Sequence, residues 1–306
     1  MNDLAYRTAL QEEIRRKFYG HDTLKSKHTP QYAMSAERQY SQTFANLYRR
    51  FDKVVLRWLP KILKVIEKEQ NQNLRTDDAV GLMQLIDLYL TKMMNDLKTE
   101  EEQEKDGSDL EEQLKTAAYL VRSAVNRGWS KAVERTLGVK ILSGYYDETF
   151  YKELLEQWFR ENMQMISSIP QELVQQIRDT LWEDITNRTT TEQMAQHIRH
   201  TCKVSQSKAK FIARDQVGKL QSRLTMQQQK DAGVREYIWS SKNDSKVRNQ
   251  HRKLNGKKFS WDSPPISDPK TGRRCHPGED YGCRCVALPV FNKNVIFPWE
   301  NLSSEK

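Results

Sequence analysis

Residues 276–285 read HPGEDYGCRC, and this short stretch does more than any other to decide how the C-terminal part of the chain folds. Its proline and two glycines are typical of an irregular loop. Its last two residues, Arg284 and Cys285, open the run RCVALP, whose apolar content predicts a strand over residues 284–289. The stretch therefore predicts a loop that passes directly into a β-strand.

The sequence before this loop changes its periodicity near Gly233. From residue 213 to residue 224, apolar side chains recur at the spacing of one helix face, whereas residues 234–239 and 258–261 read as strands. Upstream of residue 188 the pattern is helical almost throughout. We therefore predict an α+β protein, in which a mainly helical N-terminal region is followed by a C-terminal module of helices and a small β-sheet.

Three local signals divide the helical part. Pro60 follows an apolar stripe over residues 44–58 and predicts a break or kink, which would give an amphipathic hairpin. Pro170 predicts the start of a new helix. Thr189 and Glu192 have the spacing of a capping box, which predicts that a short helix begins there and that a longer one follows.

An acidic segment without apolar anchors, residues 99–109, interrupts the helical pattern. Such a run is typical of an exposed linker or a frayed helix end, so it is the best candidate for a domain boundary. We predict four parts in chain order: a helical N-terminal region at 1–110, a helical connecting region at 111–188, the α+β module at 189–293 and a tail at 294–306.

The net charge of +9 is concentrated in one segment. Residues 203–293 contain twenty Lys or Arg against eight Asp or Glu, a net charge of +12, and the rest of the chain has a net charge of −3. This asymmetry is expected where part of a chain faces nucleic acid, although a solvated basic surface without a partner would give the same count. Cations along helices would contact phosphates, which predicts non-specific binding to double-stranded DNA with a steep salt dependence. The predicted contacts are Lys208, Lys210, Arg214, Lys219, Arg223, Lys246, Arg252 and Lys253.

Three of the four cysteines fall within eleven residues. In a reducing compartment such clustering favours a metal over disulfides. At the start of a strand Cys283 and Cys285 would point the same way, because side chains alternate along a strand. Structural zinc takes four nitrogen or sulfur ligands, so we predict a zinc ion held by Cys283, Cys285, His251 and either His276 or Cys275. The alternative is that the two cysteines are small semi-buried residues and that His251 bonds a neighbour.

Other charged residues of the module are interpreted as structural. Asp244 and Arg248 are four residues apart and would pair on a helix, and Arg248 could equally reach Asp215 on the preceding helix. We predict that these three residues brace the module. His251 and Glu279 are groups that a metal-assisted hydrolase could use, but the module has no tight acidic pair, nucleophile elbow or phosphate-binding glycine loop. We therefore predict no enzymatic activity.

Five sequence elements occur in a fixed order in this module. They are IARDQ at 212–216, YIW at 237–239, DSKVRNQH at 244–251, LNG at 254–256 and HPGEDYGCRC at 276–285. This series resembles the phage Mu F-like domain of minor head proteins, in which an Ala-Arg-Asp-Gln-type helix, a Trp-bearing strand, an Asp-x-x-x-Arg-x-x-His helix and a closing Cys-Arg-Cys follow one another. The resemblance covers residues 189–291, about one third of the chain.

The resemblance implies a structural role in the head of a tailed phage. It implies a minor component of the procapsid that acts in head morphogenesis, is associated with the portal protein at the portal vertex and contacts the packaged genome or the scaffold. The chain begins without an apolar leader and has no apolar run of eighteen residues. We therefore expect a protein that is made in the host cytoplasm, does not enter a membrane and becomes part of the virion.

Two rival functions remain open at this stage. The first is a metal-dependent nuclease or a toxin-like hydrolase, with His251 as general base and the Cys283/Cys285 pair holding the ion. The second is a host-encoded DNA-binding adaptor that never enters a virion.

Overall fold

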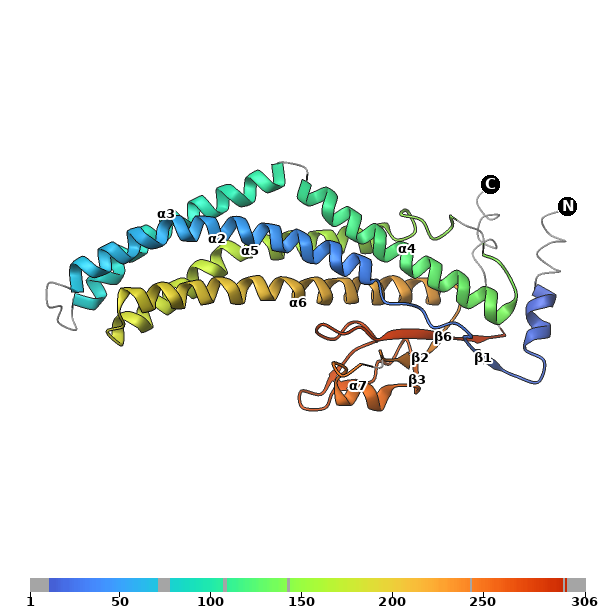
Figure 1. The fold of residues 1–306 in the computed structure, drawn as a ribbon. Helices are drawn as coiled ribbons and strands as arrows, with labels where there is room; N and C mark the ends of the chain where they lie inside the picture. The colour runs from blue at the N-terminus through green and yellow to red at the C-terminus, as the bar shows by residue number, and fades with distance from the viewer. Residues whose placement is uncertain are drawn as a thin grey trace. The chain divides into compact units, whose positions relative to one another are not determined.

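The computed structural model describes residues 11–70, 78–106, 109–141, 144–242, 244–293 and 295. Its order of elements confirms the predicted α+β class: long helices come first and a small sheet is built mainly at the end (Figure 1). The elements are β1 (Thr23–Lys25), α2 (Met34–Gln70), α3 (Asp78–Asp106), α4 (Asp109–Leu137), α5 (Lys152–Thr186), α6 (Thr191–Asp231), β2 (Glu236–Ser240), α7 (Asn249–Leu254), β3 (Lys258–Ser260), β4 (Ile266–Asp268), β5 (Arg273–Arg274) and β6 (Val286–Asn292).

The described residues fall into two compact units, and neither unit is a single stretch of sequence. Unit 1 comprises Met1–Glu37, Thr116–Trp158 and Arg214–Lys306, and unit 2 comprises Arg38–Lys115 and Phe159–Ala213. Unit 1 therefore combines the sheet with an N-terminal segment and with parts of α4, α5 and α6. Segments that are far apart in the sequence fold together in each unit.

The main sheet of unit 1 has four antiparallel strands in the order β1-β6-β2-β3. Strands β6 and β2 form its centre and pair over five residues, from Glu236 opposite Val290 to Ser240 opposite Val286. The three predicted strands correspond to β2, β3 and β6. The predicted irregular loop also contains the two-stranded sheet β4-β5, and the edge strand β1 comes from a segment that we read as helical.

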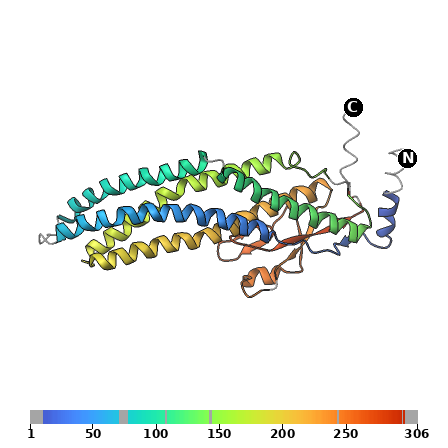
Figure 2. The ribbon, with the colours of Figure 1, turned by 45° about the horizontal axis from the view of Figure 1, so that its top comes forward.

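Unit 2 is a bundle built from segments of α2, α3, α5 and α6, which run side by side in both ribbon views (Figures 1 and 2). The predicted apolar stripe of α2 is its core: Phe44, Leu47 and Phe51 are all buried. Polar pairs join the helices, including Arg178 with Asp87 at 2.8 Å. The sequence pattern thus gave the correct buried face of this unit.

The predicted helix breaks at Pro60 and Pro170 are absent, and the alternative of a kink at Pro60 stays a prediction. Helix α2 continues through Pro60, and α5 continues through Pro170. A proline inside a helix removes one backbone hydrogen bond and bends the axis, and packing of the apolar faces holds both helices together across that defect. The predicted hairpin at Pro60 is therefore wrong.

Helix α6 differs from the prediction in its length and in its first residues. Helix α6 is one element over 41 residues, not a short helix followed by a longer one. Its capping box is shifted by one residue: Thr190 Oγ1 accepts from the Gln193 backbone N–H, and Gln193 Oε1 accepts from the Thr190 backbone N–H, each at 3.3 Å.

Of the predicted acidic linker, residues 99–106 belong to α3, and residues 107 and 108 lie outside the described residues.

Candidate functional site

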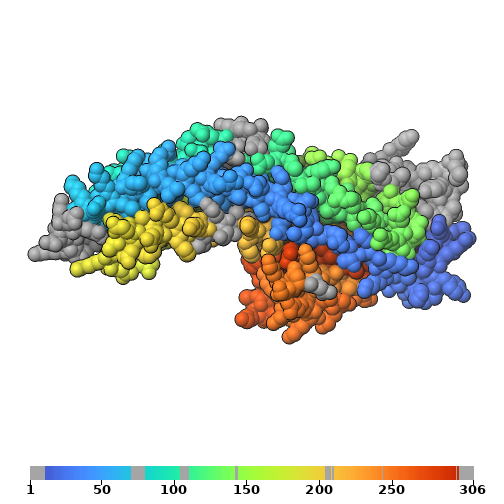
Figure 3. Space-filling model, viewed as in Figure 1, coloured from blue at the N-terminus to red at the C-terminus, as the bar shows by residue number. Residues whose placement is uncertain are grey.

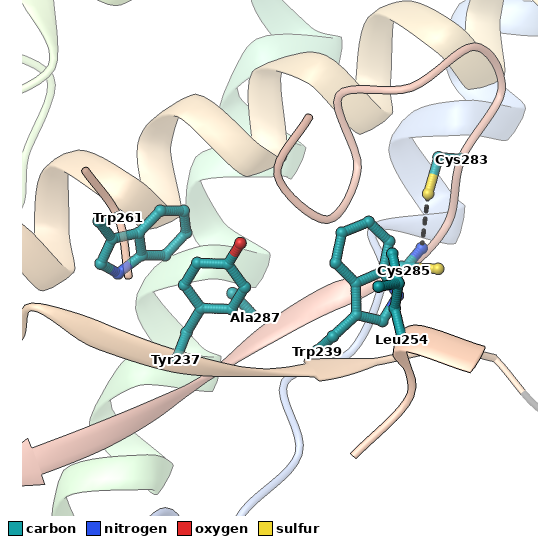
Figure 4. Packing of buried hydrophobic residues seen from close by; sticks show 7 residues of the cluster. All are labelled: Tyr237, Trp239, Leu254, Trp261, Cys283, Cys285 and Ala287. Carbon is teal, nitrogen blue, oxygen red and sulfur yellow. Dashed lines mark hydrogen bonds between the residues drawn. The ribbon is translucent and has the colours of Figure 1, made fainter. Parts of the chain in front are cut away.

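The candidate site lies in unit 1, where α7 meets the loop that leads into β6. His251 is on α7, and Cys283 and Cys285 precede Val286, the first residue of β6. Both cysteines belong to a buried cluster with Tyr237, Trp239, Leu254, Trp261 and Ala287. Figure 4 shows the cysteines beside Trp239, at the opposite end of this cluster from Trp261.

The histidine and the two cysteines converge on one point. The Nδ1 atom of His251 lies 3.5 Å from Cys283 Sγ and 3.7 Å from Cys285 Sγ. One ligand atom from each of the three residues lies within 4.8 Å of the other two. The side chains are deeply buried, with exposed fractions of 2% for His251, 3% for Cys283 and 5% for Cys285. The structure thus brings together three of the residues that the sequence predicted as metal ligands.

The opposite side of the imidazole faces a carboxylate. His251 Nε2 lies 3.1 Å from Oδ2 of Asp280, which is itself only 2% exposed. Asp280 is held in turn by the Tyr281 backbone N–H at 2.9 Å and by Arg273 at 3.3 Å. An acceptor at Nε2 places the ring proton on that nitrogen. In the neutral ring, the lone pair is then on Nδ1, the nitrogen that lies near both sulfur atoms.

The pKa values of the three residues are shifted in different directions. Hydrogen bonding from Cys285, together with the nearby imidazole, lowers the pKa of Cys283 well below its usual value. The hydrogen bond to Cys283 and burial both raise the pKa of Cys285. Burial alone would lower the pKa of His251, but the hydrogen bonds to Asp280 and Cys283 outweigh it and raise this pKa to about 9. These directions favour a negative charge on Cys283, a positive charge on His251 and a neutral thiol at Cys285.

Two further polar groups face the sulfur atoms. The backbone N–H of Cys285 donates to Cys283 Sγ at 3.4 Å, the interaction drawn as a dashed line in Figure 4. The indole N–H of Trp239 is buried without a well-formed hydrogen bond, and it lowers the pKa of Cys285. The Trp239 ring also packs edge-on against His251, with 5.2 Å between ring centroids. The two sulfur atoms thus lie in a buried environment that includes the Trp239 ring, the indole N–H of Trp239 and the backbone N–H of Cys285.

The structure does not bring His276 or Cys275 to this cluster. His276 Nδ1 lies 2.9 Å from the hydroxyl of Tyr237, and its ring packs on Trp261 at 4.9 Å between centroids. Cys275 is buried in the β4-β5 region, where its backbone N–H donates to the carbonyl of Pro265. Both residues are therefore engaged outside the histidine–cysteine–cysteine cluster.

The three predicted brace residues each join two segments, but with partners other than those predicted. Residue 244 precedes α7, so Asp244 and Arg248 do not share a helix. Asp244 pairs with Arg284 at 2.7 Å, and Arg248 lies 3.7 Å from Asp280. On α6, Asp215 pairs with Lys219 at 2.6 Å and accepts from the backbone N–H of Gly282 at 3.0 Å. These contacts tie α6 and the segment before α7 to the loop that carries the cysteines.

The predicted DNA contacts separate into three groups. Lys208 and Lys210 are exposed and belong to unit 2. Arg214, Lys219 and Arg223 are half-buried, and two of them are engaged in ion pairs, Arg214 with Glu37 at 3.2 Å and Lys219 with Asp215. Lys246, Arg252 and Lys253 are exposed on α7 and the segment before it, and Figure 3 shows the α7 region in orange. The α7 group is therefore more accessible to a polyanion than Arg214, Lys219 and Arg223 of α6.

Sequence reasoning missed Asp280 and a close contact between two glycines. A Cβ atom on Gly218 of α6 would lie 2.7 Å from the carbonyl oxygen of Cys283 and 2.9 Å from that of Gly278. Gly278 has a φ of +95°, a conformation that L side chains rarely adopt. An isolated glycine inside a helical pattern is a usable signal for such close packing. No comparable signal separates Asp280 from Glu279, which instead accepts from the backbone N–H of His276 at 2.7 Å.

These observations define a class: a helical protein that carries a basic α+β module with a buried histidine–cysteine–cysteine cluster. Residues 175–288 match the sequence model of the family described as phage Mu protein F like protein. The match confirms the family resemblance for this part of the chain, and it begins within α5, earlier than the resemblance we drew from residue 189.

One curated relative has a comparable segment. It is a protein of Haemophilus influenzae strain Rd that is described as an uncharacterized protein, and it is 32% identical over 133 residues. The match covers 44% of this chain and 28% of the relative's length. No solved structure matches the chain. Among the described residues, no helix is both long enough and apolar enough to cross a membrane.

Proposed function

We propose that the protein is a minor head protein of a tailed phage and that it acts in head morphogenesis as a structural component. The observation that carries this proposal is the match of residues 175–288 to the phage Mu F-like family. That segment contains the ordered motifs, the buried cluster and the basic α7 region. The finer proposals are association with the portal vertex, presence in the virion and contact with the packaged DNA.

The buried cluster favours a structural role over the enzymatic rival. In that rival, His251 would act as the general base of a metal-dependent nuclease or toxin-like hydrolase, beside an ion held by Cys283 and Cys285. A general base and its ion must meet the substrate, however, and His251, Cys283 and Cys285 are only 2%, 3% and 5% exposed. A group buried in this way can hold a loop in place but cannot reach a polymeric substrate.

The head proposal is tested in a phage that encodes this chain. Procapsids and virions purified from a wild-type infection should both contain the protein, and it should co-purify with the portal protein from assembling heads. A phage lacking the gene should yield fewer filled heads, and expression of the chain in trans should restore them. Absence of the protein from both procapsids and virions would refute the proposal.

DNA contact is proposed through the exposed α7 group, Lys246, Arg252 and Lys253. Each neutralised phosphate contributes about 0.9 to the slope of log affinity against log salt. Replacing all three residues with alanine should therefore reduce this slope by up to about 2.7. The matched control replaces three exposed lysines of α2, Lys53, Lys64 and Lys68, and should leave the slope close to that of the wild type.

The measurement is fluorescence anisotropy with a duplex of arbitrary sequence over a range of salt concentrations. A second duplex of different sequence should give the same affinity, because phosphate contacts carry no sequence information. Equal slopes for the α7 triple variant and the α2 control would overturn the assignment of the DNA contact to α7. Absence of salt-sensitive binding in the wild type would overturn DNA contact itself and leave the head proposal to its own test.

A further inference from the structure

We propose that His251, Cys283 and Cys285 form a zinc site with three protein ligands and a fourth position taken by a non-protein ligand such as water. The proposal does not depend on the function in head assembly. It concerns how α7 and the start of β6, which are separated by about thirty residues of mostly irregular chain, are held together.

The distances fit one shared ion. Zinc binds thiolate sulfur at about 2.3 Å and imidazole nitrogen at about 2.0–2.1 Å with tetrahedral angles, so a sulfur and a nitrogen on one zinc ion lie about 3.5–3.6 Å apart. The two separations between His251 Nδ1 and the cysteine sulfurs are 3.5 Å and 3.7 Å. Both separations thus match those between an imidazole nitrogen and a thiolate sulfur that share one zinc ion.

Hydrogen bonds alone do not explain why both cysteine sulfur atoms lie near the same imidazole nitrogen. Nδ1 has one lone pair or one proton in the ring plane, so it can form one good hydrogen bond. Here it faces two sulfur atoms at nearly equal distance, and both sulfurs are buried. A single ion between the three atoms would use the Nδ1 lone pair and both sulfurs at once.

The surroundings are those expected around a metal-bound histidine and metal-bound thiolates. A histidine that binds a metal commonly donates its other ring N–H to a carboxylate. Here His251 Nε2 lies 3.1 Å from Oδ2 of Asp280. The backbone N–H of Cys285 points at Cys283 Sγ, and the buried indole N–H of Trp239 lacks a well-formed acceptor. A thiolate at Cys285 would give that indole the negatively charged acceptor it lacks.

The choice of metal and ligand number follows from the donor set. Two thiolates and one imidazole suit zinc, whereas calcium and magnesium require oxygen ligands. Among the described residues, the group that can share an ion contains these three residues and neither His276 nor Cys275. The site therefore differs from the four-residue site predicted from the sequence, because its fourth ligand comes from outside the chain.

The test uses the full chain purified without a histidine tag, with metal content measured by mass spectrometry. The wild-type protein should contain one zinc ion per chain. Variants His251→Gln, Cys283→Ser and Cys285→Ser should each bind zinc at least about tenfold more weakly, because loss of even an outer-shell partner costs about 10–100-fold in metal affinity. The matched controls are His276→Gln and Cys275→Ser, which change the same residue types at buried positions of the same module, and both should keep it.

A second measurement on wild-type protein keeps the test decisive if a site variant fails to fold. Protein stripped with a chelator should take up cobalt and show thiolate-to-cobalt charge-transfer absorption. X-ray absorption of the zinc form should show two sulfur neighbours and one imidazole nitrogen. Folded wild-type protein that binds neither zinc nor cobalt would overturn the proposal, and so would zinc retained by Cys283→Ser or lost from both controls.

Discussion

The contact between Gly218 and the cysteine loop gives a sharp prediction, because the cost of one added methyl group can be worked out from the structure. In Gly218→Ala the new Cβ would lie 2.7 Å from the carbonyl oxygen of Cys283 and 2.9 Å from that of Gly278. Both are backbone atoms, so no side chain can rotate to relieve the contact. Overpacking of this kind costs about 1–3 kcal/mol. Two backbone clashes place Gly218→Ala in the upper half of that range.

Helix propensity acts in the opposite direction. Alanine is favoured over glycine inside a helix by about 1 kcal/mol, so the net expectation for Gly218→Ala is a loss of about 1–2 kcal/mol. Gly81 on α3 is the matched control, because a Cβ there would have no neighbour within 4 Å. Gly81→Ala should therefore gain up to about 1 kcal/mol. The same substitution should thus change stability in opposite directions at the two sites.

Hydrogen exchange followed by mass spectrometry measures the two effects separately. In Gly218→Ala, peptides that cover residues 276–292 should exchange faster, while peptides from α3 should be unchanged. In Gly81→Ala, the α3 peptides should exchange at the same rate or more slowly. If Gly218→Ala protects the 276–292 segment as well as the wild type does, the close packing of α6 on the loop is refuted.

Three smaller predictions concern polar contacts of unit 1. Asp215→Ala leaves the backbone N–H of Gly282 without its acceptor at 3.0 Å and should lower the free energy of unfolding by about 1–3 kcal/mol in urea denaturation. Tyr237→Phe removes the 2.9 Å contact with His276 and should cost about 1 kcal/mol in the same assay. Burial, followed by two nearby cations, lowers the pKa of His28 below 6.5, so folding stability should decrease as pH falls below 6.5 and the NMR titration midpoint of His28 should lie below that value. Replacing His28 with Gln should remove this part of the pH dependence.

The sequence was most informative where the signal is periodic or chemically specific. Helix faces follow from the spacing of apolar residues, so the buried positions of α2, including Phe44 and Phe51, were predictable. The chemistry of imidazole and thiol likewise pointed to His251, Cys283 and Cys285, and the structure brings these three side chains together. Both kinds of signal depend on residues that are close in sequence or limited to a few side-chain types.

The remaining features depend on contacts that no local pattern encodes. A proline predicts a break from its own geometry, but Pro60 lies in a helix that is stabilised by the whole bundle. The segment containing β1 becomes a strand only because β6, more than 250 residues later, offers a free edge. Similarly, His276 and Cys275 have side chains that can bind zinc as well as those of the other predicted ligands. Their exclusion from the cluster depends on their tertiary contacts, which the sequence does not encode locally.

The path of the 276–285 loop is fixed by contacts from several directions. Asp215 of α6 holds the backbone of Gly282, Gly218 of the same helix packs against two loop carbonyls, and His251 of α7 contacts Asp280 from the other side. Each contact restrains a different part of the loop, so together they orient both cysteine side chains before any ion binds. Preorganisation of this kind reduces the entropy lost on binding. It also means that a variant at Gly218, which carries no metal ligand, should weaken zinc binding through the backbone of Cys283.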